Sequence, residues 1–504
     1  MLAQVHSFVL RGIEPIACEV EVDVADRGLP RTTIVGLPDA AVRESMERVR
    51  SAIENSGFVY PEARLLVSLA PGDVRKEGPV FDLPIAVGLL LSVGAVRSER
   101  HKRLLFAGEL ALDGRVRPVG GVINLAMLAK SMGAEGVVVP VECAGEATAV
   151  AGIDVYPAGT LGAVVGFLNG DHAIEPATPA SVDLALARAE ATVDFAEVKG
   201  QEAVKRAMTI AAAGAHNLLL VGPPGTGKTM MARALPSILP PMTRDEALEV
   251  TRIYSSVGQV PPGCPLITAR PVRSPHHTAS QAALIGGGTV PRPGEVSLAH
   301  RGVLFLDELP EFPRPVLETL RQPLEDGHVT IARAQATVQL PARFMLVAAM
   351  NPTPKGDTPR DAVGQREMQR YLSRLSGPLI DRVDVHVQAP PVPYQRLTDA
   401  KPGTDSATLR QHVVAARDRQ LARNGSPLKP NAALRAGELD RLSPLDEPSK
   451  RLVKQAMTEL GLSARAYDKV RRLARTIADL EGSDAIELAH VSEAIGYRLL
   501  DRSA

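Results

Sequence analysis

The pattern of apolar and polar residues over positions 1–170 predicts strands and helices in alternation. Helical spacing is clearest in residues 39–56, where Val42, Met46, Val49 and Ile53 recur on one face. A second helical pattern runs through residues 121–133. Strand-like runs lie between the helical patterns, at residues 19–24, 64–69, 104–107 and 136–141. We therefore expect this part of the chain to form an α/β domain with its own core.

A different pattern follows between residues 195 and 395. Three short, wholly apolar runs at 218–221, 303–306 and 344–349 each lead directly into small or polar residues. Such runs are typical of parallel strands that are buried on both faces. Residues 258–294 are rich in Gly and Pro, which excludes a regular helix and predicts a long loop-rich insertion.

The C-terminal part, from about residue 405, is predicted to be largely helical. Helices are expected at 448–460, 463–480 and 484–500, and the middle one carries an apolar stripe that includes Val470, Leu473 and Ile477. Between the first two regions, residues 170–190 are rich in Ala, Pro, Thr and Asp, a composition typical of an inter-domain connector.

Composition places the chain among globular proteins. It has 504 residues, of which 45% are hydrophobic and 23% charged, and this excludes disorder or coiled coil as descriptions of the whole. The 57 basic and 57 acidic residues cancel, so a polyanion partner would need a local basic patch. The basic residues are mostly arginine, the side chain that binds phosphate bidentately.

The chain shows no sign of export or of a membrane span. Its apolar segments are too short to cross a bilayer, and its first residues lack a basic segment followed by an apolar one. The three cysteines lie more than a hundred residues apart, which fits neither a disulfide framework nor a paired zinc site. We therefore expect a cytoplasmic protein with no membrane partner.

The strongest motif begins directly after the apolar run 218–221 and precedes a helical pattern. It fits the phosphate-binding pattern GxxxxGK[ST] and consists of Gly222, Pro223, Pro224, Gly225, Thr226, Gly227, Lys228 and Thr229. Its glycines allow successive backbone N–H groups to point at phosphates, beside the positive end of a helix. Lys228 is predicted to reach the β- and γ-phosphates, and Thr229 to ligate Mg²⁺.

Two further strand ends carry polar residues. The run 303–306 ends at Asp307 and Glu308, where a parallel strand would bring Asp307 to Mg²⁺ and Glu308 to the attacking water. The run 344–349 leads to Asn351, which would orient that water or contact the γ-phosphate. The alternative for Asn351 is an ordinary turn made by Asn followed by Pro.

These motifs resemble those of AAA+ ATPases, and most closely the ComM/YifB family of magnesium-chelatase-like proteins. The resemblance covers nearly the whole chain, and its longest runs are RPVRSPHHTASQAALIGGG, PRPGEVSLAHRGVLFLDELPEF, LRQPLEDGHVTIARA, FMLVAAMNP and LSGPLIDRVDVHV. It implies that Asn351 is the sensor-1 residue, Arg382 a finger donated to the neighbouring subunit, and Arg465 the sensor-2 residue. It also places Val198 and Gly200 against the adenine. For both arginines, the alternative is a solvated helix face.

The resemblance also implies a division into domains. An α+β domain similar to the Lon protease would occupy residues 1–172, followed by a linker at 173–190. An AAA+ P-loop core with an insertion would span 191–395, and a helical lid 396–504. The positions that match the protease's Ser and Lys are Val80 and Leu125. Because Ser–Lys catalysis needs a hydroxyl and an amine, we predict that this domain is not a protease.

The family resemblance also bears on metal and nucleic-acid partners. Relatives carry a cysteine cluster after the sensor-1 Asn, but residues 351–360 contain none, so no zinc is expected. His276, His277 and His300 lie in matching motifs, where a hydrogen-bonding role is favoured over metal ligation. The insertion and a hairpin near residues 327–334 would project into the pore of a ring. The candidate basic residues there are Arg270, Arg273, Arg292 and Arg333, with exposed surface arginines as the alternative.

The sequence thus predicts an ATPase that binds ATP and Mg²⁺ and assembles as a hexamer with copies of itself. The family resemblance implies a helicase-like motor on single- or double-stranded DNA, which promotes branch migration in recombination. Two alternatives stay open: a motor that drives magnesium insertion into a porphyrin, and a protein-remodelling chaperone.

Overall fold

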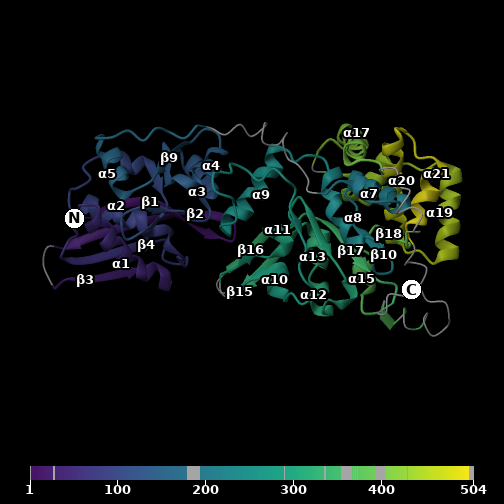
Figure 1. Ribbon diagram of the computed structural model, residues 1–504, viewed down its shortest axis with the longest axis horizontal. Coiled ribbons are helices and arrows are strands. Elements are labelled where there is room, and N and C mark those ends of the chain that lie inside the picture. Colours follow the sequence, from purple (N-terminus) through teal and green to yellow (C-terminus); the bar gives the residue numbers. More distant parts are fainter. Residues whose placement is uncertain are drawn as a thin grey trace. The chain divides into compact units, whose positions relative to one another are not determined.

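The computed structural model describes residues 2–25, 29–178, 193–288, 290–333, 336–353, 366, 368, 370–371, 373–392, 403–427 and 429–498. The chain divides into two compact units. The first contains Met1–Arg188, Thr243–Thr268 and Thr289–Arg292, and the second contains Ala189–Met242, Ala269–Gly288 and Pro293–Ala504. Each unit has its own hydrophobic core. Figure 1 shows the helices and strands along the chain.

A seven-stranded mixed sheet forms the centre of the first unit. Its spatial order is β3-β4-β2-β1-β5-β8-β9, with antiparallel pairing of β1 with β2 and of β2 with β4, and parallel pairing elsewhere. The strands are β1 (Leu2–Arg11), β2 (Glu14–Ala25), β3 (Arg31–Val35), β4 (Arg64–Ala70), β5 (Leu104–Phe106), β8 (Gly136–Pro140) and β9 (Asp154–Ala158). Two short strands, β6 (Glu109–Leu110) and β7 (Val116–Arg117), form a separate ribbon.

The helices of the first unit bury their apolar faces in its core. They are α1 (Ala40–Asn55), α2 (Asp82–Ser92), α3 (Val122–Met132), α4 (Ala144–Thr148), α5 (Leu161–Asn169) and α9 (Arg244–Ser256). In α1, Asp39 caps the first turn by accepting from the Val42 amide, and Val42, Val49 and Ile53 are buried as the helical spacing predicts.

Helix α9 comes from a distant part of the sequence and packs with the first unit. The Gly121 amide, at the start of α3, donates to the Ser255 carbonyl oxygen at 2.8 Å and to its hydroxyl at 3.0 Å. The Asn124 amide donates to the Arg252 carbonyl, and the Arg252 guanidinium donates back to Asn124 and to Glu14. The segment between the phosphate loop and Asp307 therefore contributes a helix to the N-terminal unit.

The second unit contains a five-stranded sheet in the order β11-β14-β17-β10-β18, and all of its pairings are parallel. Its strands are β10 (Leu218–Val221), β11 (Val272–Arg273), β14 (Val303–Leu306), β17 (Met345–Met350) and β18 (Val385–Gln388). Since β14 and β17 are neighbours and β17 pairs with β10, the carboxyl ends of the three apolar runs meet at one edge.

Helices cover this sheet and continue into the C-terminal region. Helices α7 (Glu202–Gly214) and α20 (Ala464–Glu481) pack against each other, and α20 buries Val470, Leu473 and Ile477 in the core that also contains β10 and β18 (Figure 1). The remaining helices are α8 (Lys228–Ala234), α10 (Gln281–Ile285), α11 (Glu295–Leu298), α12 (Arg314–Glu318), α13 (Arg321–Asp326), α15 (Gly377–Ile380), α17 (Ser406–Asn424), α18 (Ala436–Leu442), α19 (Glu447–Leu460) and α21 (Leu488–Gly496). A hairpin of β15 (His328–Arg333) and β16 (Ala336–Pro341) separates β14 from β17 in sequence.

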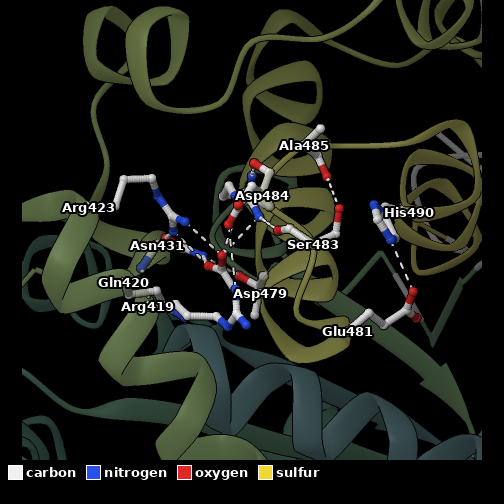
Figure 2. Close-up of polar contacts among 12 residues, drawn as sticks. Arg419, Gln420, Arg423, Asn431, Asp479, Glu481, Ser483, Asp484, Ala485 and His490 are labelled. Carbon is white, nitrogen blue, oxygen red and sulfur yellow. Dashed lines mark hydrogen bonds and ion pairs between the residues drawn. The ribbon is translucent and has the colours of Figure 1, made fainter.

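A buried polar cluster ties the C-terminal helices together. Asp479 of α20 accepts two hydrogen bonds from Arg423 at 2.7 Å, one from Asn431 at 2.8 Å and one from Arg475 at 3.1 Å (Figure 2). Both Asp479 and Arg475 are 2% exposed, so this carboxylate depends on its partners for compensation of its lost hydration.

Most predicted elements are present, with shifted ends. The runs at 218–221 and 303–306 are strands with those bounds, whereas the last predicted helix begins at Leu488 rather than at residue 484. The proposed linker lies largely outside the described residues, as does the boundary at 395–396, so the predicted division into domains stays a prediction. Among the described residues, no helix is both long and apolar enough to cross a bilayer.

Candidate functional site

The phosphate-loop motif forms a tight turn between β10 and α8. Gly225 and Gly227 have φ angles of +78° and +82°, a backbone conformation that side-chain-bearing residues rarely adopt. Gly222 lies so close to the end of β18 that a Cβ added there would be 2.3 Å from the Ala389 carbonyl oxygen. The motif's glycines are thus required by the local backbone, and this explains their spacing in the sequence.

Lys228 lies inside the loop and connects it to the third strand end. Its ammonium group donates to the carbonyl oxygens of Gly222 at 2.6 Å and Pro223 at 2.9 Å, and to Asn351 Oδ1 at 3.2 Å. The side chain is largely buried, and this burial lowers the pKa of Lys228, although Asp307 and Glu308 act in the opposite direction. The structure therefore brings Lys228 and Asn351 together as one contact.

Thr229 and Asp307 form the second contact of the site. The Thr229 hydroxyl donates to Asp307 Oδ2 at 2.7 Å, and the other Asp307 oxygen accepts from the Glu308 amide at 3.0 Å. A hydroxyl and a carboxylate side by side form an all-oxygen donor set, which is what Mg²⁺ prefers. These two residues therefore fit a magnesium ion that is shared with a phosphate group.

Glu308 follows Asp307 in a left-handed backbone conformation, with a φ angle of +52°. This conformation is uncommon for a residue with a side chain and turns the chain sharply at the strand end. The Glu308 carboxylate is exposed, and its Oε2 lies 3.4 Å from His277 Nδ1. It therefore lies at the open end of the strand rather than buried in the sheet, as a general base for a water molecule would require.

His277 contacts Glu308, whereas the sequence favoured a hydrogen-bonding structural role for this histidine. Its ring stacks on that of His276, with centroids 4.1 Å apart, and meets the edge of Phe312 at 6.4 Å. The signal that could have found it is topological: the histidines follow β11, which pairs in parallel with β14. Residues that follow these two strands meet at the same sheet edge, so His277 reaches Glu308.

Tyr371 is a second residue that sequence reasoning missed. It is buried near the acidic turn, and burial together with the negative charges of Glu311 and Glu308 raises its pKa to about 12. The neighbouring Arg374 donates two hydrogen bonds to Glu311, each at 3.1 Å. This arrangement fixes the turn that follows Glu308.

The segment predicted to contact adenine lies against the phosphate loop. Val198 is buried, and Gly200 and Gln201 both have φ angles near the left-handed region, +66° and +60°. The Gln201 side-chain amide donates to the Thr226 carbonyl at 3.3 Å and to the Pro390 carbonyl at 2.6 Å. Gln201 thereby joins this segment to the loop, although the adenine contact itself stays a prediction.

The predicted finger, Arg382, lies on the turn between α15 and β18. Its guanidinium donates to the Pro378 carbonyl at 2.6 Å and forms an ion pair with Glu325, the next-to-last residue of α13. Glu325 lies three residues before the β15–β16 hairpin. The structure thus places Arg382 beside the base of the β15–β16 hairpin.

Arg465, the predicted sensor-2 residue, is exposed on the first turn of α20. The other three arginines of α20 that could take the sensor-2 role have partners of their own. Arg471 pairs with Asp440, Arg472 donates to the Leu434 carbonyl, and Arg475 belongs to the Asp479 cluster. Among these four arginines of α20, Arg465 alone lacks a partner within the described residues.

Comparison with known proteins identifies the family. The family described as "Magnesium chelatase, subunit ChlI" matches residues 194–397, "Subunit ChlI of Mg-chelatase" matches residues 20–143, and "Magnesium chelatase, subunit ChlI C-terminal" matches residues 403–498. The competence protein ComM of Haemophilus influenzae is 45% identical over 505 residues, which cover 99% of this chain and 98% of ComM. The chain belongs to the ComM/YifB family.

Two other relatives show the breadth of the family. The uncharacterized protein YifB of Salmonella typhimurium is 43% identical over 504 residues, with 99% of this chain and 98% of YifB covered. The magnesium-chelatase 38 kDa subunit of Rhodobacter capsulatus is 25% identical over 331 residues, which cover 60% of this chain and 87% of that subunit. This ComM/YifB protein is therefore a magnesium-chelatase-like AAA ATPase by family, and its parallel sheet agrees with an AAA+ core.

The candidate pore arginines of this family member differ in availability. Arg270 donates to three main-chain carbonyl oxygens, those of Pro240, Pro241 and Arg301, and Arg273 forms a bidentate pair with Glu295. The Arg292 side chain is 73% exposed and lies 3.9 Å from Glu77. The Arg333 side chain lies outside the described part of the structure. Arg292 is thus the most accessible of the three candidate pore arginines whose side chains are described.

The remaining positions singled out in the sequence are His300, residues 354–360, Val80 and Leu125. His300 is buried and accepts from the Arg343 amide at 3.0 Å, and within the described residues no cluster of three or more His, Cys, Asp or Glu could hold a metal ion. Residues 354–360, where a cysteine cluster is missing, lie outside the described ranges. Val80 is half-buried and Leu125 fully buried, so the apolar positions of the N-terminal unit are packed.

Proposed function

We propose that this protein is an ATP-hydrolysing ring motor that acts on DNA. The observation that carries the proposal is the meeting of three strand ends, in which Lys228 contacts Asn351 and Thr229 contacts Asp307. Residues that follow β10, β14 and β17 supply an ammonium group, an oxygen donor pair and an amide within one small volume. That combination serves phosphoryl transfer, whose catalysis depends on position and charge stabilisation.

Each residue has a distinct role in this proposal. Lys228 holds the β- and γ-phosphates, and Thr229 and Asp307 hold Mg²⁺, which when bound neutralises charge on the phosphate oxygens. Glu308 accepts a proton from the attacking water, and Asn351 orients that water. Val198 and Gly200 flank the adenine, and the backbone of residues 222–229 cradles the phosphates.

Arg382 acts in the neighbouring subunit of a hexameric ring. In its own subunit the guanidinium is paired with Glu325, whose side chain is 59% exposed, whereas the Arg382 side chain is 13% exposed and must turn outward to reach a neighbour. At the neighbour's nucleotide it stabilises the charge that develops on the γ-phosphate. Arg465, which has no partner within the described residues of its own subunit, contacts the nucleotide of its own subunit as sensor 2.

DNA is the proposed substrate, single- or double-stranded, with branch migration during recombination as the process. Support comes from the full-length similarity to a protein that bears the name competence protein ComM, and from the exposed Arg292. A ring concentrates such groups around its pore even though the net charge of the chain is zero. The N-terminal unit is a non-proteolytic scaffold, because Val80 and Leu125 cannot act as nucleophile and base.

A second candidate is a magnesium-chelatase-like motor, favoured by the similarity to the Rhodobacter capsulatus subunit. A third candidate is a protein-remodelling ATPase, which the following experiment distinguishes from the other two.

ATP hydrolysis should be measured with and without single- and double-stranded DNA at low salt. Stimulation by DNA together with retention of the protein on DNA supports the motor on DNA. An ATPase that neither responds to nor binds DNA would favour protein remodelling, and ATP-dependent magnesium insertion into a porphyrin would favour the chelatase class. Glu308→Gln should retain ATP binding and lose turnover, whereas Glu44→Gln, at an exposed position of α1, should retain turnover. Hydrolysis by Glu308→Gln at the wild-type rate would refute the assignment of the general base.

A further inference from the structure

Three consecutive main-chain carbonyl groups around the predicted finger accept hydrogen bonds from two side chains of other elements. The Arg382 carbonyl oxygen accepts from the Asn217 side-chain amide at 2.9 Å. The carbonyl oxygens of Asp381 and Val383, on either side, both accept from the Lys469 ammonium group, the latter at 3.0 Å. The finger's backbone is thus held by contacts far from it in sequence.

Lys469 belongs to α20 and lies one helical turn after Arg465, the predicted sensor-2 residue. It is 7% exposed, and its ammonium group is also 3.4 Å from Asp384 Oδ1. A buried ammonium group keeps its place only where hydrogen bonds and an opposite charge replace its hydration. The helix that carries the predicted sensor-2 arginine is therefore fixed to the segment that carries the predicted finger.

Asn217 connects the same segment to the sheet. It lies directly before β10, and its Oδ1 accepts from the Leu346 amide in β17 at 2.9 Å. The main-chain amide of Asn217 donates to Asp384 Oδ2 at 3.2 Å. Its main-chain carbonyl oxygen accepts from the main-chain amides of Asp384 and Val385. The strand β17 leads directly to Asn351, so this contact joins the predicted finger to the strand before the predicted sensor-1 residue.

The charged groups around Asp384 reinforce this junction. His216 Nδ1 lies 3.6 Å from Asp384, and its Nε2 is hydrogen-bonded to Thr476 of α20 at 2.8 Å. Arg498 donates to the carbonyl oxygens of Val383 and Asp384. His386 also contributes to the electrostatic environment of Asp384 from β18. Several groups from the C-terminal region therefore converge on the turn that holds Arg382.

We propose that Lys469 and Asn217 are positioning residues for Arg382, which make the finger that a subunit offers its neighbour depend on the placement of its own lid helix α20. This inference rests on the proposed function, because it requires ATP hydrolysis with Arg382 acting in trans. A displacement of α20 moves the Lys469 contacts, and with them the main chain that carries the guanidinium. Since a misplacement of about 1 Å can reduce a rate about 100-fold, a small movement is sufficient.

The test uses rings mixed from two full-length variants. An Arg382→Ala subunit can hydrolyse ATP but offers no finger, and a Glu308→Gln subunit offers a finger but cannot hydrolyse. Mixing them should restore hydrolysis at interfaces where a Glu308→Gln subunit serves an Arg382→Ala subunit. Lys469→Met is then added to either partner, with Lys454→Met of α19, an exposed lysine, as the matched control.

We expect Lys469→Met in the finger-offering subunit to reduce the restored kcat by about 10- to 100-fold with little change in KM for ATP. The same change in the hydrolysing subunit should have a smaller effect, and Lys469→Arg should recover part of the loss. Equal loss from either placement, or no loss from placement in the finger-offering subunit, overturns the proposal. No recovery on mixing the two parent variants contradicts the trans role of Arg382 instead.

Asn217→Asp provides a second variant if Lys469→Met fails to fold or to join rings. It keeps the shape of the side chain and the acceptor for the Leu346 amide, but it removes the group that donates to the Arg382 carbonyl. In the finger-offering subunit it should lower the restored kcat in the same way. Wild-type recovery with a correctly folded Asn217→Asp subunit, judged by thermal unfolding and by ring size, also overturns the proposal.

Discussion

The Thr229 hydroxyl donates to Asp307 Oδ2 at 2.7 Å, across 78 positions of sequence. The two oxygens are adjacent because β10 and β14 are both neighbours of β17 in one parallel sheet. The insertion between them, which includes α9, does not disturb this contact. The chemistry of the site is thus set by strand order, and the intervening chain is free to serve another purpose.

Thr229→Val should weaken the use of Mg²⁺. The valine methyl groups keep the shape of the side chain but cannot offer an oxygen beside Asp307, so the Mg²⁺ concentration for half-maximal ATPase activity should rise at least about tenfold. A magnesium titration of hydrolysis measures this. Thr229→Ser, which retains the hydroxyl, should behave nearly as the wild type. An unchanged titration for the valine variant would argue against Thr229 as a ligand.

His277→Ala should slow hydrolysis through Glu308. The imidazole lies 3.4 Å from the carboxylate and restrains an otherwise exposed side chain. We expect kcat to fall about tenfold with KM for ATP unchanged, since general-base catalysis requires orientation. The control is His276→Ala, because His276 bonds to Thr278 and, among the described residues, forms no hydrogen bond or ion pair with Glu308. A rise in kcat would mean that His277 restrains Glu308 away from its working position.

Glu325→Gln should make the finger more available. Glu325, whose side chain is 59% exposed, pairs with Arg382, whose side chain is 13% exposed, and at about 1 kcal/mol for the pair the expected gain in kcat is about fivefold. ATPase rates over a range of protein concentrations measure the effect. Asp326→Asn, the adjacent exposed carboxylate, is the matched control. A loss of activity specific to Glu325→Gln would indicate that the pair positions Arg382 rather than competes for it.

The N-terminal unit should lose stability as pH rises from about 4.5 to 7. Burial raises the pKa of Glu146 from 4.5 to about 7, although Ser255 and the Val122 amide lower it by hydrogen bonding. In this window the folded state binds more protons than the unfolded state, so the free energy of unfolding falls with rising pH.

Glu146→Gln should remove this dependence and stabilise the protein at pH 8 by on the order of 3 kcal/mol, with no gain near pH 4.5. Thermal unfolding at both pH values measures it. Glu142→Gln, at an exposed position nearby, should change neither value. Equal melting temperatures for Glu146→Gln and the wild type at pH 8 would contradict a proton-binding role.

Asp479→Asn should destabilise the C-terminal helices. The change leaves the guanidinium groups of Arg423 and Arg475 without their shared carboxylate in a site that is 2% exposed, which costs about 3 kcal/mol or more (Figure 2). Chemical unfolding measures the loss. Asp468→Asn on the same helix, which is only half-buried, should be nearly neutral. A small effect at Asp479 would mean that water enters the cluster.

The phosphate loop and its two partner strands could be predicted from sequence because each is a local pattern. Lys228, Asp307 and Asn351 each follow an apolar run, and parallel strands bring such ends together whatever lies between. His277, Glu325 and Lys469 could not be placed in this way. Their contacts depend on how a loop, a short helix and a distant helix pack, and none of these leaves a periodic signal in the chain.

Helix α9 shows the same limit at the level of the fold. Its capping residues and apolar spacing identify a helix, since Thr243 and Glu246 form a capping box. Nothing in that pattern indicates which core receives its apolar face. The choice is made by α3, through the pairing of Gly121 and Asn124 with Ser255 and Arg252.

Because residues 243–268 and 289–292 belong to the first unit, the polypeptide passes between the two units five times. A single proteolytic cut between residues 173 and 190 would therefore leave α9 covalently joined to the second unit, and the N-terminal fragment would be held to α9 by noncovalent contacts alone. Deletion of residues 1–172 would leave α9 without the surface that buries Val250 and Ile253. The remaining fragment would expose these apolar side chains and would be prone to aggregate. Removal of the whole first unit therefore requires changes within residues 243–268 as well as at the N-terminal end of the gene.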